Sequence, residues 1–314
     1  MSLSAKQVQS LTQAAAQLKE RMRATIRGKD AVIDQVLTAM LAGGHVLIED
    51  LPGLGKTTLA YSLARALDCP FQRIQFTSDL LPADILGVSV FDEHQKQFIF
   101  RPGPVFSHIL LADEINRSTP KTQSALLEAM DRGKVSIDGE TRDLGQPFMV
   151  FATQNPVDFE GTFPLPDSQM DRFLMRLQMG YADYNDELQI LRDGRRAYDA
   201  IQSDPLFDAA QVLEWQSWVP QVFVEDSVLR KLLDLVTATR QESEFRAGIS
   251  TRGSLALKTA AQAHALLRGR DFVIPEDIQS VFLPVCTHRL NLRHPGSDLL
   301  EERNAISAKL RELM

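Results

Sequence analysis

A glycine-rich turn between a short apolar run and an amphipathic stretch has the composition of a phosphate-binding loop. Within residues 50–57, Gly53 and Gly55 allow the backbone to turn its N–H groups inward, toward a bound anion. Lys56 adds a point charge, and the helix expected to begin there directs the positive end of its dipole at the same place. Thr57 brings a hydroxyl oxygen that can serve as one ligand of a phosphate-bound Mg²⁺. The turn is therefore suited to bind a polyphosphate together with its metal ion.

Asp50 departs from the general phosphate-loop pattern, which has a glycine at this position. A carboxylate beside phosphates is electrostatically unfavourable unless its side chain turns away and accepts hydrogen bonds from loop amides. The sequence leaves the geometry at the start of the loop open.

A second apolar run, 109–112, ends in two adjacent carboxylates, Asp113 and Glu114. Open α/β sheets present their functional groups at the carboxyl ends of the strands. We expect Asp113 to hold Mg²⁺ through water and Glu114 to orient and deprotonate an attacking water. A solvated acidic turn is the alternative reading, which the phosphate loop upstream disfavours.

The elements that must position these groups alternate between strand and helix. Apolar runs at 45–48, 71–76, 109–112, 148–152 and 173–177 have the pattern of buried strands, and helical segments separate most of them. The pattern predicts an α/β fold with a largely parallel sheet flanked by helices.

Helix-terminal signals support one of the intervening helices, over residues 121–130. Thr119 is placed to cap it, Pro120 stands at the first helical position, and Gly133 stands at the far end. Two further stretches, 88–101 and 134–144, interrupt the alternation and have the pattern of hairpins. The second contains Asp138-Gly139, a dipeptide suited to a type I′ turn.

From about residue 184 onward the strand signal fades and helical segments dominate. The clearest of them are 227–240, 254–267 and 276–281. We expect two domains, an α/β core over 1–182 and a smaller all-α domain over 183–314, with the boundary near Ala182.

Composition limits the class of protein. The 314 residues include 34 Lys and Arg against 41 Asp and Glu, a formal net charge of −7, which lacks the basic excess of a dedicated nucleic-acid binder. Cys69 and Cys286 have no metal-binding or disulfide spacing, and the six histidines form no HExxH pattern. Because no apolar run is long enough for a membrane span or signal peptide, we expect a cytoplasmic location.

Several motifs in matching order resemble the AAA+ ATPases, and specifically the MoxR family, across nearly the whole chain. These motifs are residues 50–58, 111–117, 152–156, 160–166 and 171–173. Asp50 is common in MoxR-like loops. The hairpins look like the insertions of the branch shared with magnesium chelatase. The resemblance implies a P-loop AAA+ core with a helical lid, and ATP with Mg²⁺ as cofactors. The expected ATP-binding residues are Gly53, Leu54, Gly55, Lys56, Thr57, Thr58 and Asp113, with Thr57 and Asp113 as the magnesium ligands.

The resemblance also implies further catalytic residues. Asn155 is expected to be sensor 1, since a strand-end amide can contact both the γ-phosphate and the attacking water. Arg172 resembles the arginine finger, which in this family reaches the nucleotide of a neighbouring subunit, and Arg117 is the second candidate. The alternative is a surface pair between Asp171 and Arg172.

Arg252 directly precedes an amphipathic stretch, where a helix dipole disfavours a cation by about 0.3–1 kcal/mol. The family places sensor 2 here, an arginine that touches the nucleotide and couples its state to domain rotation. A solvated arginine is the alternative. The tryptophans Trp215 and Trp218 are expected to pack in a core.

The implied function is ATP hydrolysis by a homo-oligomeric ring, by family expectation a hexamer, that remodels a client protein or metalloenzyme complex. A von Willebrand factor A-domain protein is the implied partner. Two alternatives remain open: the ATPase motor of a metal chelatase, which residues 160–166 disfavour, and a DNA-acting AAA+ protein, which the net charge disfavours. The client itself has no signature in the sequence.

Overall fold

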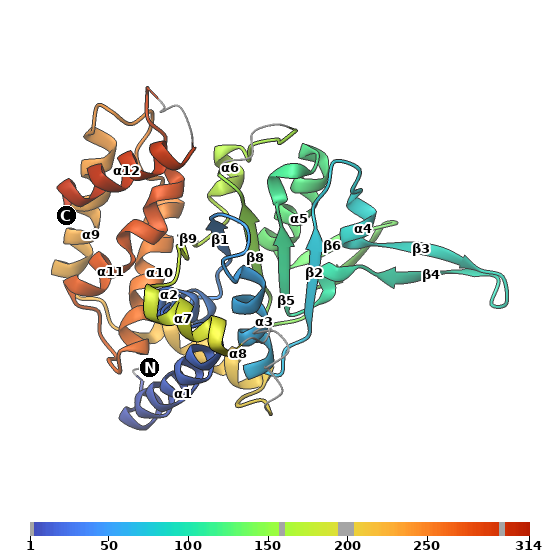
Figure 1. Ribbon diagram of the computed structural model, residues 1–314, viewed down its shortest axis with the longest axis horizontal. Coiled ribbons are helices and arrows are strands. Elements are labelled where there is room, and N and C mark those ends of the chain that lie inside the picture. Colours follow the sequence, from blue (N-terminus) through green and yellow to red (C-terminus); the bar gives the residue numbers. More distant parts are fainter. Residues whose placement is uncertain (1–2, 157–160, 194–203, 295–298) are drawn as a thin grey trace.

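A five-stranded parallel sheet forms the centre of the molecule (Figure 1). The computed structural model describes residues 3–156, 161–193, 204–294 and 299–314. The strand order is β2-β5-β8-β1-β9. The strands are β1 (Val46–Glu49), β2 (Phe71–Gln75), β5 (Ile109–Asp113), β8 (Met149–Gln154) and β9 (Met175–Leu177). The predicted parallel sheet is confirmed, and the helices of the core pack on its two faces.

Burial follows the position of each strand in the sheet. Every residue of β1 and β8 is buried, as expected of central strands covered on both faces. The prediction of a buried strand at 71–76 is wrong in one respect. β2 lies at the sheet edge, and Gln72, Arg73 and Gln75 are exposed. Polar residues on this strand are therefore free to reach the two carboxylates at the end of β5.

The core helices begin and end close to their sequence signals. They are α1 (Ala5–Thr25), α2 (Asp30–Leu41), α3 (Lys56–Ala66), α4 (Pro82–Leu86), α5 (Pro120–Arg132) and α6 (Asp167–Met170). In α5, the Thr119 side chain accepts a hydrogen bond from Thr122 N, and Gly133 ends the helix in the left-handed region at φ 62°. These caps confirm the predicted helix.

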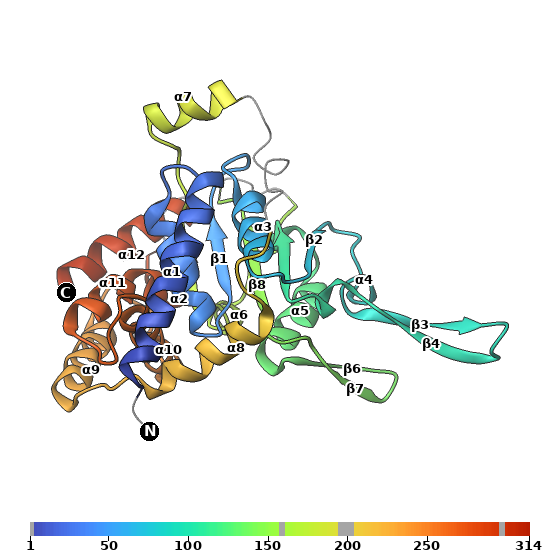
Figure 2. The same cartoon turned by 90° about the horizontal axis from the view of Figure 1, so that it is seen from below.

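Both expected hairpins form. They are β3 (Gly87–Asp92) with β4 (Gln97–Pro102), and β6 (Lys134–Ile137) with β7 (Glu140–Asp143). Asp138 and Gly139 both have positive φ, as a type I′ turn requires. The β3–β4 hairpin projects far from the sheet (Figures 1 and 2), and it exposes apolar side chains, among them Phe98 at 72%.

Helices dominate the C-terminal part of the chain. They are α7 (Tyr184–Asp193), α8 (Ala209–Trp218), α9 (Asp226–Gln241), α10 (Thr251–Leu267), α11 (Pro275–Cys286) and α12 (Leu299–Leu313), with a 3₁₀ turn, η4 (Thr287–Arg289), after α11. The helices α9 to α12 gather beside β9 as a lid (Figure 1). α8 instead lies against α2, where Gln216 donates to Met40 O at 2.7 Å, and it buries Trp215 and Trp218 as predicted. The boundary near Ala182 stays a prediction.

Within the described ranges, none of the helices combines the length and the apolar character that crossing a membrane requires.

Candidate nucleotide-hydrolysis site

The phosphate loop connects the carboxyl end of β1 to α3. Gly53 and Gly55 adopt φ of 84° and 91°, which side chains rarely tolerate. The first α3 hydrogen bond runs from Leu59 N to Gly55 O, and no side chain caps the helix. The helix geometry therefore leaves the preceding amides available to an anion. Lys56 Nζ lies within the same loop and donates to Asp50 O at 2.6 Å.

The Asp50 side chain does turn away from the loop centre. One carboxylate oxygen accepts from Leu51 N at 2.9 Å, and the other accepts from Met179 N and Gly180 N, each at 2.7 Å. Three amides thus satisfy the charge that seemed out of place in the sequence. Asp50 also ties the start of the loop to the segment that leaves β9.

Strand order brings the acidic pair beside this loop. β8 lies between β5, which carries Asp113, and β1, which carries the loop. Thr153 of β8 donates to Asp113 Oδ1 at 2.6 Å and accepts from Glu114 N at 2.8 Å. Glu114 has a left-handed backbone, φ 55° and ψ 51°, which costs about 1–3 kcal/mol and recurs at functional sites. Asn155 directly follows β8 at the same edge.

Two residues of β2 that sequence analysis missed also hold the acidic pair. Arg73 Nη2 donates to Asp113 Oδ2 at 2.6 Å, and Gln75 Nε2 donates to Glu114 Oε2 at 2.9 Å. The signal that could have revealed them is their i, i+2 spacing on the strand, since such residues share one face. Arg117 Nη1 also lies 3.0 Å from Glu114 Oε2, so the second finger candidate stands at this edge.

The carboxylates of this site lie close enough to Lys56 to affect its pKa. Burial lowers the pKa of Lys56, while the negative charges of Asp113, Asp50 and Glu114 oppose that shift. A lysine with three carboxylates around it and free amides beside it can neutralise phosphate oxygens. Hydroxyl and carboxylate oxygens of Thr57 and Asp113 are ligands of the kind Mg²⁺ takes. The donor set therefore fits a nucleoside triphosphate with its magnesium ion.

Arg172 lies at the opposite end of the parallel strands, near their amino ends. It follows α6 and precedes β9, and Leu174 N donates to His45 O at 2.8 Å, at the amino end of β1. The four residues of β1, which span about 13 Å, thus separate the backbone near Arg172 from the phosphate loop. Figure 2 shows α6 on the side of the sheet away from the loop that precedes α3.

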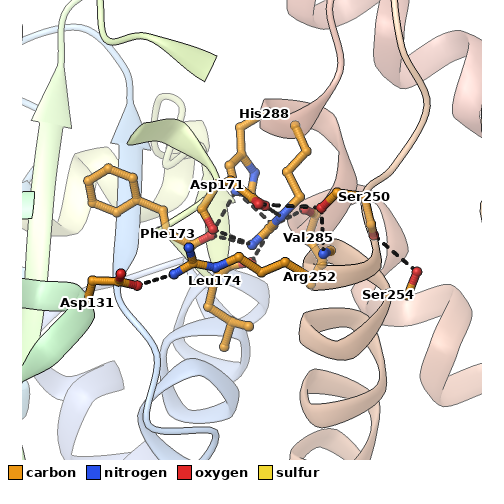
Figure 3. A network of polar contacts seen from close by, with 11 residues as sticks. Asp131, Asp171, Phe173, Leu174, Ser250, Arg252, Ser254, Val285 and His288 are labelled. Carbon is orange, nitrogen blue, oxygen red and sulfur yellow. Dashed lines mark hydrogen bonds and ion pairs between the residues drawn. The ribbon is translucent and has the colours of Figure 1, made fainter. Parts of the chain in front are cut away.

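The alternative of an Asp171–Arg172 surface pair is not what the structure shows. Asp171 Oδ1 accepts instead from Arg289 Nε of η4 at 2.7 Å. Asp171 lies between the core and the lid helices (Figure 3). No side-chain partner of Arg172 is recorded among the residues that the structure describes.

Arg252, the expected sensor 2, belongs to the first turn of α10 and forms an ion pair with Asp131 at the end of α5 (Figure 3). Asp131 is next to Met130, whose carbonyl lies 3.2 Å from His45 Nε2, so this pair also stands at the amino edge. The ion pair compensates for a cation at a helix N-terminus. The structure does not bring Arg252 to the phosphate loop of its own chain.

One motif falls partly outside the described residues, which exclude Glu160. Of the rest, Phe163 N donates to Asn116 O at 2.7 Å and Phe163 O accepts from Gln123 Nε2 at 2.9 Å. These bonds pack residues 161–166 against η2 (Ile115–Arg117) and α5.

Comparisons with known proteins place this geometry in context. A model of the ATPase family associated with various cellular activities (AAA) matches residues 45–175, and a model of the AAA lid domain matches residues 237–310. The YeaC protein of Bacillus subtilis is 45% identical over 295 residues, covering 94% of this chain and 91% of the relative. Chaperone MoxR1 of Mycobacterium tuberculosis is 39% identical over 278 residues, with 86% and 73% covered.

Protein MoxR of Methylorubrum extorquens is 30% identical over 314 residues, with 89% of this chain and 88% of the relative covered. The crystal structure of a Cytophaga hutchinsonii protein assigned as an ATPase superposes with a TM-score of 0.88 at 35% identity. That match covers 98% of this chain and 96% of the other.

Proposed function

Because this chain belongs to the MoxR family of AAA+ ATPases, we propose that it hydrolyses ATP as a ring and uses the energy to remodel a client protein. The relative called Chaperone MoxR1 supports the second part of this proposal.

In this proposal the carboxyl ends and the amino ends of the parallel strands have different roles. At the carboxyl edge, the phosphate-loop amides and Lys56 bind the phosphates, and Glu114 orients and deprotonates the attacking water. Asn155 contacts that water and the γ-phosphate as sensor 1. When bound, Mg²⁺ would supply positive charge to the phosphates, and Thr57 and Asp113 would hold it.

The proposal of a ring rests on the placement of Arg172 at the amino ends of the strands. A finger that cannot reach the nucleotide of its own subunit must act on that of a neighbour, through a head-to-tail contact. Such contacts close into a ring when the rotation allows it, and six subunits is the family expectation. Arg252 stands at the same edge, so we propose that any contact of it with nucleotide is also made across subunits.

In this proposal the client is a protein or a metalloenzyme complex, with a von Willebrand factor A-domain protein as the partner. The apolar β3–β4 hairpin supports a protein client, because exposed apolar side chains of this size mark interaction surfaces. Capture with Glu114→Gln and ATP, compared with ADP, followed by mass spectrometry tests this part. Recovery of no protein in an ATP-dependent manner would contradict it.

Different observations bear on the two alternative functions. A DNA-acting protein needs free cations there, yet Lys134 pairs with Asp143 at 2.9 Å. Arg142 pairs with Glu140 at 2.5 Å and stacks 4.1 Å over the Phe100 ring. These pairs disfavour nucleic acid at the β6–β7 hairpin, whereas Lys96 and Arg101 of the β3–β4 hairpin are exposed. A chelatase motor keeps the same ATP chemistry, and an assay for metal insertion into a tetrapyrrole distinguishes it.

The ring is tested by mixing two inactive variants. Arg172→Ala should bind ATP normally but lose about 10³–10⁵ in turnover, the usual worth of an arginine finger. Lys56→Ala should bind ATP only weakly yet keep its finger. In mixed rings, an intact Lys56 meets an intact Arg172 at some interfaces, so hydrolysis should return. If cross-linking shows mixed oligomers that stay inactive, Arg172 is not the finger, and Arg117 takes its place in the same experiment.

A further inference from the structure

We propose that Arg289 of the lid is the positioning residue for Arg172, so that the lid of one subunit sets the finger offered to the next. This inference rests on the proposed function, in which Arg172 acts across the subunit interface. Arg289 contacts residues 171–174 and not the phosphate loop of its own chain. It acts through the backbone on both sides of Arg172.

The first observation is the number of acceptors that one guanidinium reaches. Arg289 Nε donates to Asp171 Oδ1 at 2.7 Å, and Nη2 donates to Phe173 O at 2.7 Å and Asp171 O at 3.3 Å. Arg289 Nη1 donates to Leu174 O at 3.1 Å and also to Val285 O within the lid. Four of these five acceptors belong to residues 171–174, which flank the finger.

The second observation is the contrast between Arg172 and its neighbours. Phe173 and Leu174 are buried, and the carbonyl of Asp171 is bound. Arg172 is partly exposed, and its side chain has no recorded partner within the described part of the chain. The backbone is held on both sides of Arg172 while no such contact holds its side chain, as a residue acting on another subunit requires.

The third observation is that the charged guanidinium of Arg289 is buried. The Arg289 side chain is only 4% exposed. Burial lowers its pKa, and the Asp171 carboxylate opposes that shift. A buried guanidinium is tolerated because the carboxylate and four carbonyls satisfy it. A lysine at this position would carry the same charge on a single nitrogen. It could not bond all the acceptors that Nε, Nη1 and Nη2 of Arg289 reach.

The lid supplies further side-chain contacts to this segment, while the core holds it through the main-chain bond from Leu174 N to His45 O at 2.8 Å. Ser250, the N-cap of α10, lies 3.4 Å from Asp171 Oδ2, and His288 Nε2 lies 2.9 Å from Phe173 O (Figure 3). Because a carbonyl accepts, His288 donates here. A lid that rotates would therefore carry residues 171–174 with it or release them. The nucleotide state sensed by one lid would then reach the neighbouring site through the finger.

The experiment uses Arg289→Lys, which keeps the charge, and Asp171→Asn, which keeps the shape of the acceptor. We expect turnover to fall about 100-fold, as a displacement of about 1 Å can cause, while ATP affinity stays within twofold. Arg270→Lys is the matched control, because Arg270 bonds Asp277 inside the lid and touches none of residues 171–174. Its turnover should match the wild type.

Mixing two variants then shows which subunit's ATP site loses hydrolysis. Arg289→Lys mixed with Lys56→Ala should regain hydrolysis, because the second variant brings a well-placed finger to the intact ATP site of the first. Arg289→Lys mixed with Arg172→Ala should show no recovery above the low turnover of Arg289→Lys, because neither supplies a well-placed finger. The opposite pattern, or wild-type turnover of both single variants, would overturn the inference. An equal loss in every mixture with a lowered melting temperature would make Arg289 a structural clamp only.

These outcomes are separate from those that test the finger itself. If Arg172→Ala hydrolyses ATP at the wild-type rate, the proposed function fails first. If Arg172→Ala is rescued by Lys56→Ala and Arg289→Lys is not, the finger stands and the lid coupling fails.

Discussion

The carboxylate of Asp50 accepts the amide of Gly180 at 2.7 Å, which joins the first residue of the phosphate loop to the chain leaving β9. The same carboxylate accepts two more amides, so it acts as an anchor between the loop and the path to the lid. A residue that looked unfavourable for phosphate binding is instead part of the loop's framework.

Asp50→Asn should destabilise the protein. Asparagine offers one oxygen in place of two, so at least one charge-assisted hydrogen bond is lost and its amide group faces another donor. We expect the free energy of unfolding to fall by about 2 kcal/mol, measured by urea denaturation. Glu93→Gln, an exposed acid in the β3–β4 turn, is the control and should change little. Equal stabilities of Asp50→Asn and the wild type would rule out the anchor.

Lys56→Ala should weaken ATP binding about 10- to 150-fold, the equivalent of roughly 1.5–3 kcal/mol for a hydrogen bond to a charged group. The loop amides remain, so the affinity falls without vanishing. Titration calorimetry measures it, with the exposed lid variant Lys231→Ala as the control. An unchanged dissociation constant would remove Lys56 from the site.

Glu114→Gln should bind ATP as the wild type does and retain it unhydrolysed. The amide keeps the shape of the side chain but removes the base, which is worth about 10²–10⁴ in rate. Single-turnover assays give the rate, and light scattering should show a ring persisting with ATP and Mg²⁺. Turnover at the wild-type rate would exclude Glu114 as the base, and a monomer at micromolar concentration would leave the ring without support.

Acid should destabilise the protein through His45. Its ring is buried, with Nδ1 accepting from Val150 N at 3.1 Å. Burial lowers the pKa of His45 from 6.5 to about 4, although the Met130 carbonyl opposes the shift. Between these values the unfolded chain binds a proton that the folded chain does not, so the free energy of unfolding falls as pH falls.

From pH 7 to pH 5 this loss should amount to about 2 kcal/mol for His45. His45→Gln cannot titrate there, so its stability should fall by that much less over the same interval. Urea denaturation at the two pH values measures both. Parallel pH dependence of the variant and the wild type would contradict the assignment.

Local signals predicted the parts of the fold that local chemistry controls. Thr119 and Gly133 delimit α5 because a cap and a left-handed terminus depend on a few adjacent residues. The Asp138-Gly139 turn forms for the same reason. The phosphate loop and the acidic pair were also predicted, since each is a short motif next to a strand.

The remaining features depend on contacts between distant parts of the chain. Arg289 and Asp171 meet across 118 positions, and no local pattern marks either as a partner of the other. The edge position of β2, which frees Arg73 and Gln75 to hold the acidic pair, follows from strand order and not from apolar content. The ion pair between Arg252 and Asp131 also joins the lid to α5 across distant parts of the chain, and no local pattern marks it.

The order of strands in the sheet also fixes when the site can form during synthesis. Val46 of β1 pairs with Phe151 of β8 and Met175 of β9, far along the chain. At roughly 5–20 residues per second, these partners emerge about 5–26 s after β1. A nascent chain therefore presents the phosphate loop before the sheet that orders it exists. ATP can stabilise the completed core but cannot guide its early folding on the ribosome.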